Sequence, residues 1–179
     1  MKGILILLSL ICLGMVQADK RQFYELKGQE IKPPMTQDYR AWEMVGRSVV
    51  HDLENLNRAI FPGIHLIYQD PISLRIFRDQ GLYPDGTTII MEVWPLSRTE
   101  AESGFAWFPN SSPELLIQIK DRRVFSGDGW SYYRVAQRDL EGGNKWLSAQ
   151  PGSACQSCHA ASASQDQVFL NYYPLWGRN

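Results

Sequence analysis

Four short segments of the chain carry alternating or β-branched apolar residues, the pattern that predicts β-strands. They span residues 64–68, 87–94, 115–120 and 130–137. A Gly-Asp-Gly turn joins the last two. Successive strands with short connections favour an antiparallel sheet, because parallel strands need long crossovers.

The alternation also indicates which side chains share a face of the sheet. On the first predicted strand, His65 and Ile67 lie on one face. On the second, Met91 and Glu92 point to opposite faces. We expect His65 and Met91 to occupy comparable places on neighbouring strands, so that both could face one site.

A first helix is predicted near the start of the patterned region. Thr36 or Asp38 can cap a helix that runs through Tyr39, Trp42 and Val45, whose spacing of three puts them on one face.

Three further segments have weaker signals. Pro71 opens a short helix that Gly81 closes. Residues 48–62 are expected to form a loop with helical character. The polar, glycine-containing stretch 97–113 predicts a long connection that could carry a binding loop.

Near the C-terminus, Cys155, Cys158 and His159 have the spacing C-x-x-C-H. This is the attachment signal for a c-type haem, in which two thiols form thioether bonds with the porphyrin and the adjoining imidazole ligates the iron. Two intervening residues suit one helical turn. We therefore expect Cys155 and Cys158 to hold one covalent haem c and His159 to be its proximal iron ligand.

Two other uses of paired cysteines fit the sequence less well. A zinc site needs a second pair of ligands, but His51 and His65 are too far apart for the usual H-x3-5-H half. A redox C-x-x-C is expected early in a βαβ unit, whereas this pair lies far along the chain.

The predicted strands and helices together give an α+β class: an antiparallel β-sheet with flanking short helices and a C-terminal haem-attachment helix.

The first 18 residues predict a secretory signal peptide, with a basic Lys2, an apolar run and a small-residue cleavage site at Val16-Gln17-Ala18. The run is shorter than the ~20 residues that cross a bilayer, so no membrane anchor is expected. Export indicates the periplasm, where c-type haem is attached. Residues 19–37 are expected to be an extended lead-in, and residues 38–179 the haem domain.

The charge balance excludes some partners. A formal net charge of −1 gives no reason to propose nucleic acid or an anionic membrane. Of the three cysteines, Cys12 falls in the predicted leader and the other two belong to the haem motif, so no disulfide framework is available.

Several motifs carry a family resemblance. They are Asp38-Tyr39-Arg40-Ala41-Trp42, Tyr83-Pro84-Asp85-Gly86-Thr87, Gly129-Trp130-Ser131-Tyr132-Tyr133, Cys155 to His159, Val168-Phe169 and Tyr172-Tyr173-Pro174. In this order and with these gaps they resemble the cytochrome P-460 family over about residues 38–174. The resemblance implies a mostly β fold, one covalent haem per subunit, a periplasmic location and usually a homodimer. Members include hydroxylamine-oxidising enzymes and the cytochromes c′-β, which bind nitric oxide and other small ligands.

Two positions depart from the hydroxylamine-oxidising members. Those members cross-link a lysine to a haem meso carbon, and alignment from the Asp85-Gly86-Thr87 turn places Met91 there. A thioether has no amine with which to form that bond. A distal arginine of the same members corresponds to His65. Both departures weaken the case for hydroxylamine oxidation.

Several roles stay open for the distal residues. Met91 could line the pocket as a flexible apolar side chain or ligate the iron. His65 could be a core histidine bonded to backbone, a pocket donor for a bound ligand, or an axial ligand. His51 is expected at the surface, and Phe61 and Phe77 could wall the pocket.

Three functions follow. The first is a periplasmic mono-haem cytochrome that binds or processes small nitrogen oxides, with nitric oxide favoured over hydroxylamine. The second is an electron carrier, serving a periplasmic redox partner, in which Met91 or His65 is the sixth iron ligand. The third is a hydroxylamine oxidase that works without the lysine cross-link. The sequence leaves open whether the protein is an enzyme.

Overall fold

The computed structural model describes residues 23–33, 39–56, 58–140, 145–173 and 176. The signal peptide predicted for residues 1–18 lies outside these ranges, as does part of the lead-in predicted for 19–37. Within the described ranges, no helix is both long enough and apolar enough to cross a bilayer.

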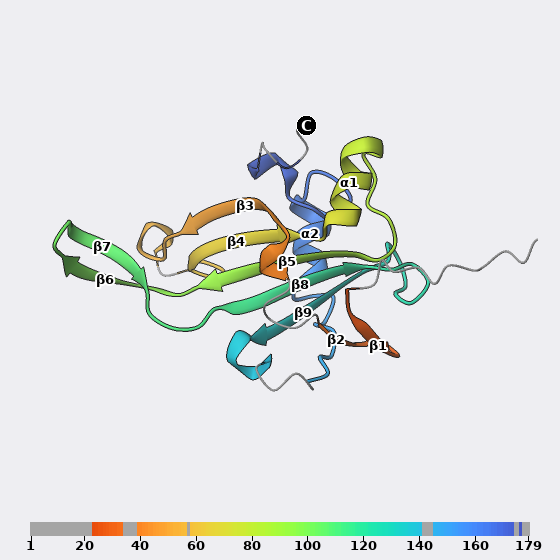
Figure 1. The fold of residues 1–179 in the computed structure, drawn as a ribbon, viewed down its shortest axis with the longest axis horizontal. Helices are drawn as coiled ribbons and strands as arrows, with labels where there is room; N and C mark the ends of the chain where they lie inside the picture. The colour runs from red at the N-terminus through yellow and green to blue at the C-terminus, as the bar shows by residue number, and fades with distance from the viewer. Residues whose placement is uncertain (1–22, 34–38, 57, 141–144, 174–175, 177–179) are drawn as a thin grey trace, which may run out of the picture.

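A five-stranded antiparallel sheet forms the centre of the molecule, in the order β3-β4-β5-β8-β9 (Figure 1). Its strands are β3 (Glu43–Val50), β4 (Gly63–Gln69), β5 (Thr87–Trp94), β8 (Glu114–Lys120) and β9 (Trp130–Ala136). The four predicted strands are therefore confirmed to within two residues at each end. Together with the flanking helices they confirm the α+β class.

The register across the sheet separates its two faces. Ile67, Met91, Leu116 and Arg134 lie opposite one another on β4, β5, β8 and β9. Directly paired residues in a sheet point to the same face. The prediction that Glu92 faces away from Met91 is confirmed, since it is almost fully buried on the other face.

One face of the sheet is covered by a short hairpin of β1 (Glu25–Lys27) and β2 (Glu30–Lys32). Ile31 is fully buried there, and its backbone bridges to Leu147. This part of the predicted lead-in is therefore extended, and it packs on the sheet because Tyr24 and Ile31 provide apolar side chains that the core can bury.

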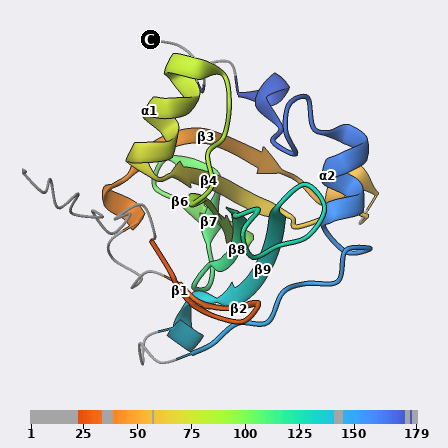
Figure 2. The same cartoon turned by 90° about the vertical axis from the view of Figure 1, so that its right-hand side faces the viewer.

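The other face carries α1 (Pro71–Gln80) and α2 (Gln156–Ser162), because Leu74 and Phe77 of α1 share a buried cluster with Ile67, Ile89 and Cys155. Figure 2 shows both helices away from the β1–β2 hairpin, which lies at the bottom of that view. The Asp70 carboxylate accepts a hydrogen bond from the Ser73 amide and caps α1. Gly81 ends the helix in the left-handed conformation, with φ of 69°. The predicted helix from Pro71 to Gly81 is confirmed.

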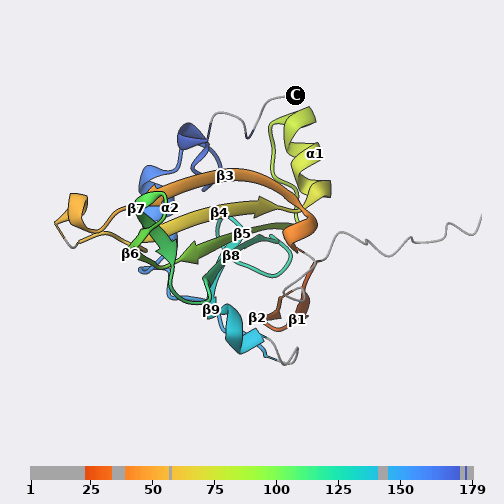
Figure 3. The ribbon, with the colours of Figure 1, turned by 60° about the vertical axis from the view of Figure 1, so that its left-hand side comes forward.

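The helix predicted through Tyr39, Trp42 and Val45 is wrong. From Tyr39, where the described residues resume, the chain forms a 3₁₀ turn, η1 (Tyr39–Ala41), and then enters β3 (Figure 3). The proposed caps Thr36 and Asp38 lie outside the described residues. The Tyr39 hydroxyl donates to the buried Glu92 carboxylate at 2.5 Å, and this contact fixes the turn against the sheet. Val45 instead belongs to a strand, the conformation that β-branched residues favour.

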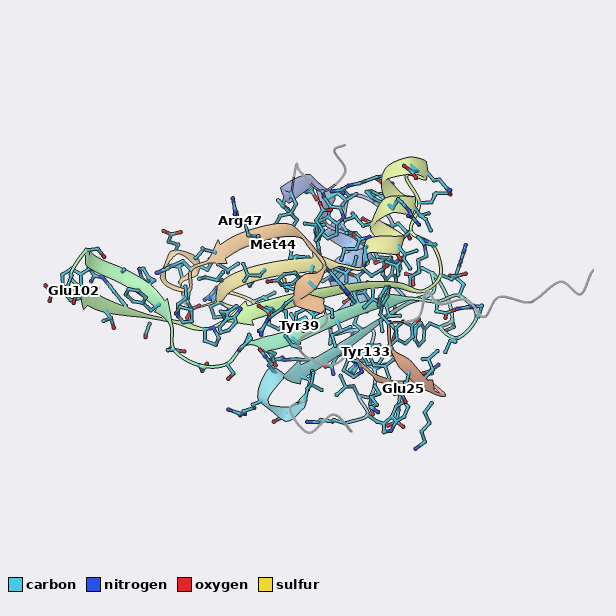
Figure 4. The ribbon with its side chains drawn as sticks, viewed as in Figure 1. Glu25, Tyr39, Met44, Arg47, Glu102 and Tyr133 are labelled. Carbon is cyan, nitrogen blue, oxygen red and sulfur yellow. The ribbon has the colours of Figure 1, made fainter. Side chains whose placement is uncertain are left out.

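The long connection predicted for residues 97–113 is also wrong in part. It contains a hairpin of β6 (Leu96–Ala101) and β7 (Gly104–Pro109) that projects from the body, with Glu102 at its outer end (Figure 4). The predicted helical character of residues 48–62 is limited to η2 (Leu53–Asn55). The remaining 3₁₀ turns are η3 (Gln137–Leu140) and η4 (Leu170–Tyr172).

Candidate haem site

A cavity of about 370 Å³ lies between the central sheet and the segment that contains α2. The sheet contributes side chains from β4, β5, β8 and β9, and the C-terminal segment closes the opposite side. Most of the lining is apolar or aromatic. Its residues are Ile60, Phe61, His65, Ile67, Ile89, Met91, Leu116, Ile117, Gln118, Tyr132, Tyr133, Ala154, Cys155, Cys158, His159, Val168, Phe169, Tyr172, Tyr173 and Trp176.

The two cysteines of the C-x-x-C-H motif both line this cavity. Cys155 precedes the first turn of α2 and Cys158 lies within the helix, so one helical turn brings both thiols to the same wall. Both thiols are free. Burial raises the pKa of the Cys155 thiol, although the nearby Arg134 guanidinium partly offsets this effect.

His159 lies on the same wall, and its ring is fixed on three sides. Its Nδ1 lies 2.7 Å from the Gln167 carbonyl oxygen. A carbonyl only accepts, so Nδ1 carries the hydrogen and Nε2 keeps its lone pair. The Tyr132 and Phe169 rings pack against the imidazole with centroids 4.7 and 4.8 Å away. Burial lowers the pKa of His159, which favours the neutral ring that a metal needs.

The carbonyl that holds His159 belongs to a strained turn. Asp166 and Gln167 both adopt left-handed conformations, with φ of 46° and 65°. The Lys120 ammonium donates to the Asp166 carboxylate at 2.5 Å, and the Trp130 indole donates to its other oxygen at 3.1 Å. The Gln167 side chain donates to Asp128 at 2.9 Å. These contacts stabilise a conformation that costs energy in an isolated chain.

His65 lies across the cavity, on β4. Its Nε2 donates to the Phe61 carbonyl at 2.6 Å. Of the three roles predicted for His65, this contact matches the histidine that is bonded to backbone. Burial lowers its pKa and keeps it neutral. Phe61 itself has a left-handed φ of 56°, and the hydrogen bond from His65 helps to hold it there. Any ligation by His65 through Nε2 would first have to break that bond.

The other distal predictions have mixed outcomes. Met91 is partly buried and lines the cavity, as does Phe61. Phe77 does not line it, because its ring stacks on Tyr83 at 4.3 Å within the core beneath α1. His51 is partly buried rather than fully exposed, since its ring packs edge-on against Trp107 at 4.4 Å.

Two further residues lie in or beside the lining of the cavity: Tyr173, which belongs to one of the sequence motifs, and Arg134, which the sequence allows either as a surface arginine or as a partner for a haem propionate. Tyr173 packs over β3 where Gly46 lacks a side chain, and a Cβ at Gly46 would lie 2.8 Å from the Tyr173 ring. Arg134 pairs with Glu114, and its guanidinium lies 5.2 Å from the centre of the Phe61 ring.

The family model for cytochrome P460 matches residues 36–170, which is more than half of the chain. The chain belongs to the cytochrome P460 family. Membership makes it a c-type haem cytochrome and confirms the resemblance drawn from the sequence motifs. No curated protein matches the chain.

The residues of the site fit a haem of the cytochrome P460 family. An apolar cavity, two thiols on one wall and a neutral imidazole with an unbonded Nε2 are the donor set that such a group needs. Within the described part of the chain, no three His, Cys, Asp or Glu side chains gather as a zinc site would require.

Sequence reasoning missed the groups that orient His159. The Gln167 carbonyl belongs to the backbone, so no residue type indicates it. Lys120 and Asp166 lie 46 positions apart and carry no spacing signal. The Lys120–Asp166 ion pair is visible only in the three-dimensional structure, where the 166–167 turn lies beside β8.

Proposed function

We propose that this cytochrome P460 protein is exported to the periplasm, attaches one haem c covalently through Cys155 and Cys158, and binds nitric oxide at the iron. His159 would be the proximal ligand. When bound, the haem supplies an iron with an axial position for a small ligand. One observation supports the proposal most: the cavity runs from the His159 imidazole to a wall whose polar group, His65, is already bonded to backbone.

The distal wall suits a small neutral ligand. Nitric oxide is uncharged, and Ile67, Met91 and Phe61 provide an apolar surface for it. His65 is neutral, and its only N–H is donated to the Phe61 carbonyl. Hydroxylamine oxidation, in contrast, requires protons to be removed, and the described cavity lining holds no carboxylate to accept them.

The experiment is an optical titration of the purified, haem-loaded protein. We expect the ferrous Soret band to change on addition of nitric oxide and of carbon monoxide. A ferrous spectrum that neither gas alters contradicts the proposal. Incubation with hydroxylamine and an electron acceptor separates ligand binding from turnover, and we expect no acceptor reduction.

Met91 supports a second candidate function, a six-coordinate electron carrier. Its thioether lines the same cavity, and methionine is an established axial ligand of c-type haem. This candidate predicts a low-spin spectrum without any added ligand and no response to the gases.

We further propose that the protein forms a homodimer and exchanges electrons with a periplasmic redox partner. Phe105 and Trp107 are exposed on one face of β7 and Phe108 on the other, and exposed apolar side chains gathered on one element are typical of interaction surfaces. Light scattering tests the first part, with a dimer mass as the expected result and a monomer mass as the contradicting one.

A further inference from the structure

The Gln167 carbonyl oxygen accepts two hydrogen bonds. One comes from His159 Nδ1 at 2.7 Å and the other from Gln118 Nε2 at 3.0 Å. The donors come from different elements, α2 and β8. They are brought together only because the 166–167 turn passes between the helix and the sheet.

Gln118 is held in place independently of the helix. It lies in the middle of β8, in register with Ile89 and Tyr132 on its two neighbours, and is only 8% exposed. Its amide nitrogen also lies 3.4 Å from the Tyr132 hydroxyl. A buried amide must find an acceptor, so Gln118 directs its N–H at the turn whatever His159 does.

The carbonyl cannot easily move away from either donor. Asp166 is anchored by Lys120 and Trp130, and the Gln167 side chain by Asp128. These anchors fix the carbonyl relative to the sheet, and the Tyr132 and Phe169 rings hold His159 in place beside it. Because the carbonyl oxygen stays in place, both N–H donors bond to the same oxygen. Each of the two hydrogen bonds is then weaker than it would be alone.

We propose that Gln118 is a positioning residue that sets how strongly His159 binds the haem iron, by sharing the Gln167 carbonyl with the imidazole. A histidine ligand that donates its second N–H more strongly becomes more basic at the metal-binding nitrogen. Gln118 weakens that donation and so holds the basicity of Nε2 down. This inference rests on the part of the proposed function that puts His159 on the iron, and not on nitric oxide binding.

The test replaces Gln118 by Leu, which has a similar volume and no donor. In the haem-loaded ferrous protein, Gln118→Leu should shift the iron–histidine stretching mode to higher frequency in resonance Raman spectra. It should also lower the reduction potential, because a more basic ligand stabilises ferric iron. If the ferrous protein proves six-coordinate, and hence low-spin, the Nδ1–H proton resonance replaces the Raman mode and should shift downfield.

Gln165→Leu is the matched control. It removes a different glutamine, one that directly precedes the 166–167 turn and whose amide donates to the Gly81 carbonyl at 2.7 Å in an exposed position. This control should leave the vibrational mode unchanged. Gln118→Met serves as a second variant if the leucine variant does not fold, since it keeps the length of the side chain.

Two results would overturn the proposal. One is an iron–histidine mode, or an Nδ1–H resonance, that stays at its wild-type position in both Gln118 variants. An unchanged mode or resonance overturns the proposal even if the reduction potential of the haem changes. A change in the polarity of the cavity would alter that potential without altering the bond between His159 and the iron. The other is an equal shift in Gln165→Leu. Neither reading involves nitric oxide, so failure of gas binding and failure of this proposal are separate outcomes.

Discussion

The two walls of the cavity differ in how firmly they hold their histidine. His159 is fixed by a hydrogen bond, two aromatic rings and a turn with its own charged anchors. Among the described residues, the His65 ring has a single hydrogen bond, to the carbonyl of a loop residue. A wall that must keep one ligand on a metal needs fixed geometry, whereas a wall that must admit different small molecules needs free space and few competing donors. The contrast suits a site that holds its proximal ligand permanently and its distal ligand reversibly.

The largest effect is expected from loss of both thiols on the proximal wall. Replacing Cys155 and Cys158 together by Ser should abolish covalent haem attachment, because serine forms no thioether with the porphyrin. Haem staining of a denaturing gel, supported by the mass of the intact protein, measures this.

Ser157→Ala is the control for the thiol variants. Ser157 lies between the cysteines and donates to the Ser153 carbonyl at 3.0 Å. This variant should stain like the wild type. Haem that survives denaturation in the double variant would contradict the assignment of the two cysteines.

The anchor of the proximal turn should have the next largest effect. Asp166→Ala leaves the Lys120 ammonium without its partner although that side chain is only 9% exposed. Leaving a charge unpaired at a buried site costs several kcal/mol. Because Asp166 is itself partly exposed, we expect a smaller loss here, of about 2 kcal/mol in the free energy of unfolding. Denaturant titration of the haem-loaded protein measures it.

Asp139→Ala provides the comparison for that loss. Asp139 pairs with Lys145, and both side chains are well exposed. Surface pairs contribute little, so no measurable change is expected. An equal loss in the two variants would mean that the Lys120–Asp166 pair has no special role in holding the turn.

The distal histidine should have a smaller effect, and one that depends on pH. His65→Phe removes the hydrogen bond to the Phe61 carbonyl, worth about 1 kcal/mol. Burial lowers the pKa of His65 in the folded protein below its unfolded value of about 6.5. The unfolded chain therefore binds more protons as the pH falls, and the wild type should lose stability below about pH 6.5.

The phenylalanine variant lacks this group, so its stability should fall less between about pH 6.5 and pH 5. His159 contributes equally to both proteins, and the difference between the two curves isolates His65. Parallel curves over this range would show that His65 is not buried as a neutral ring.

The sequence predicted the sheet better than the parts that pack against it. The strand β5 was found from end to end because its β-branched run has no competing signal. The hairpin β6–β7 was missed because Arg98, Glu100 and Glu102 make the segment read as polar. In the structure the Arg98 guanidinium lies over the Phe105 ring at 4.3 Å, a cross-strand contact that composition does not reveal.

The candidate site divides in the same way. Cys155, Cys158 and His159 are consecutive parts of one motif, so their chemistry could be read directly from spacing. Gln118 and the Gln167 carbonyl could not, because they meet only through the register of β8 and a turn with two left-handed residues.

The smallest effect is expected at Met91, and it decides between the two candidate functions. Met91→Leu keeps an apolar side chain of similar volume on β5 and removes the sulfur, so the free energy of unfolding should fall by less than about 1 kcal/mol. If the distal wall leaves the iron position open, the spectrum of the haem-loaded protein should stay as it is in the wild type. A change from low-spin to high-spin would instead identify the Met91 thioether as the sixth ligand. It would also remove the contrast between the two walls, since each would then hold a permanent ligand.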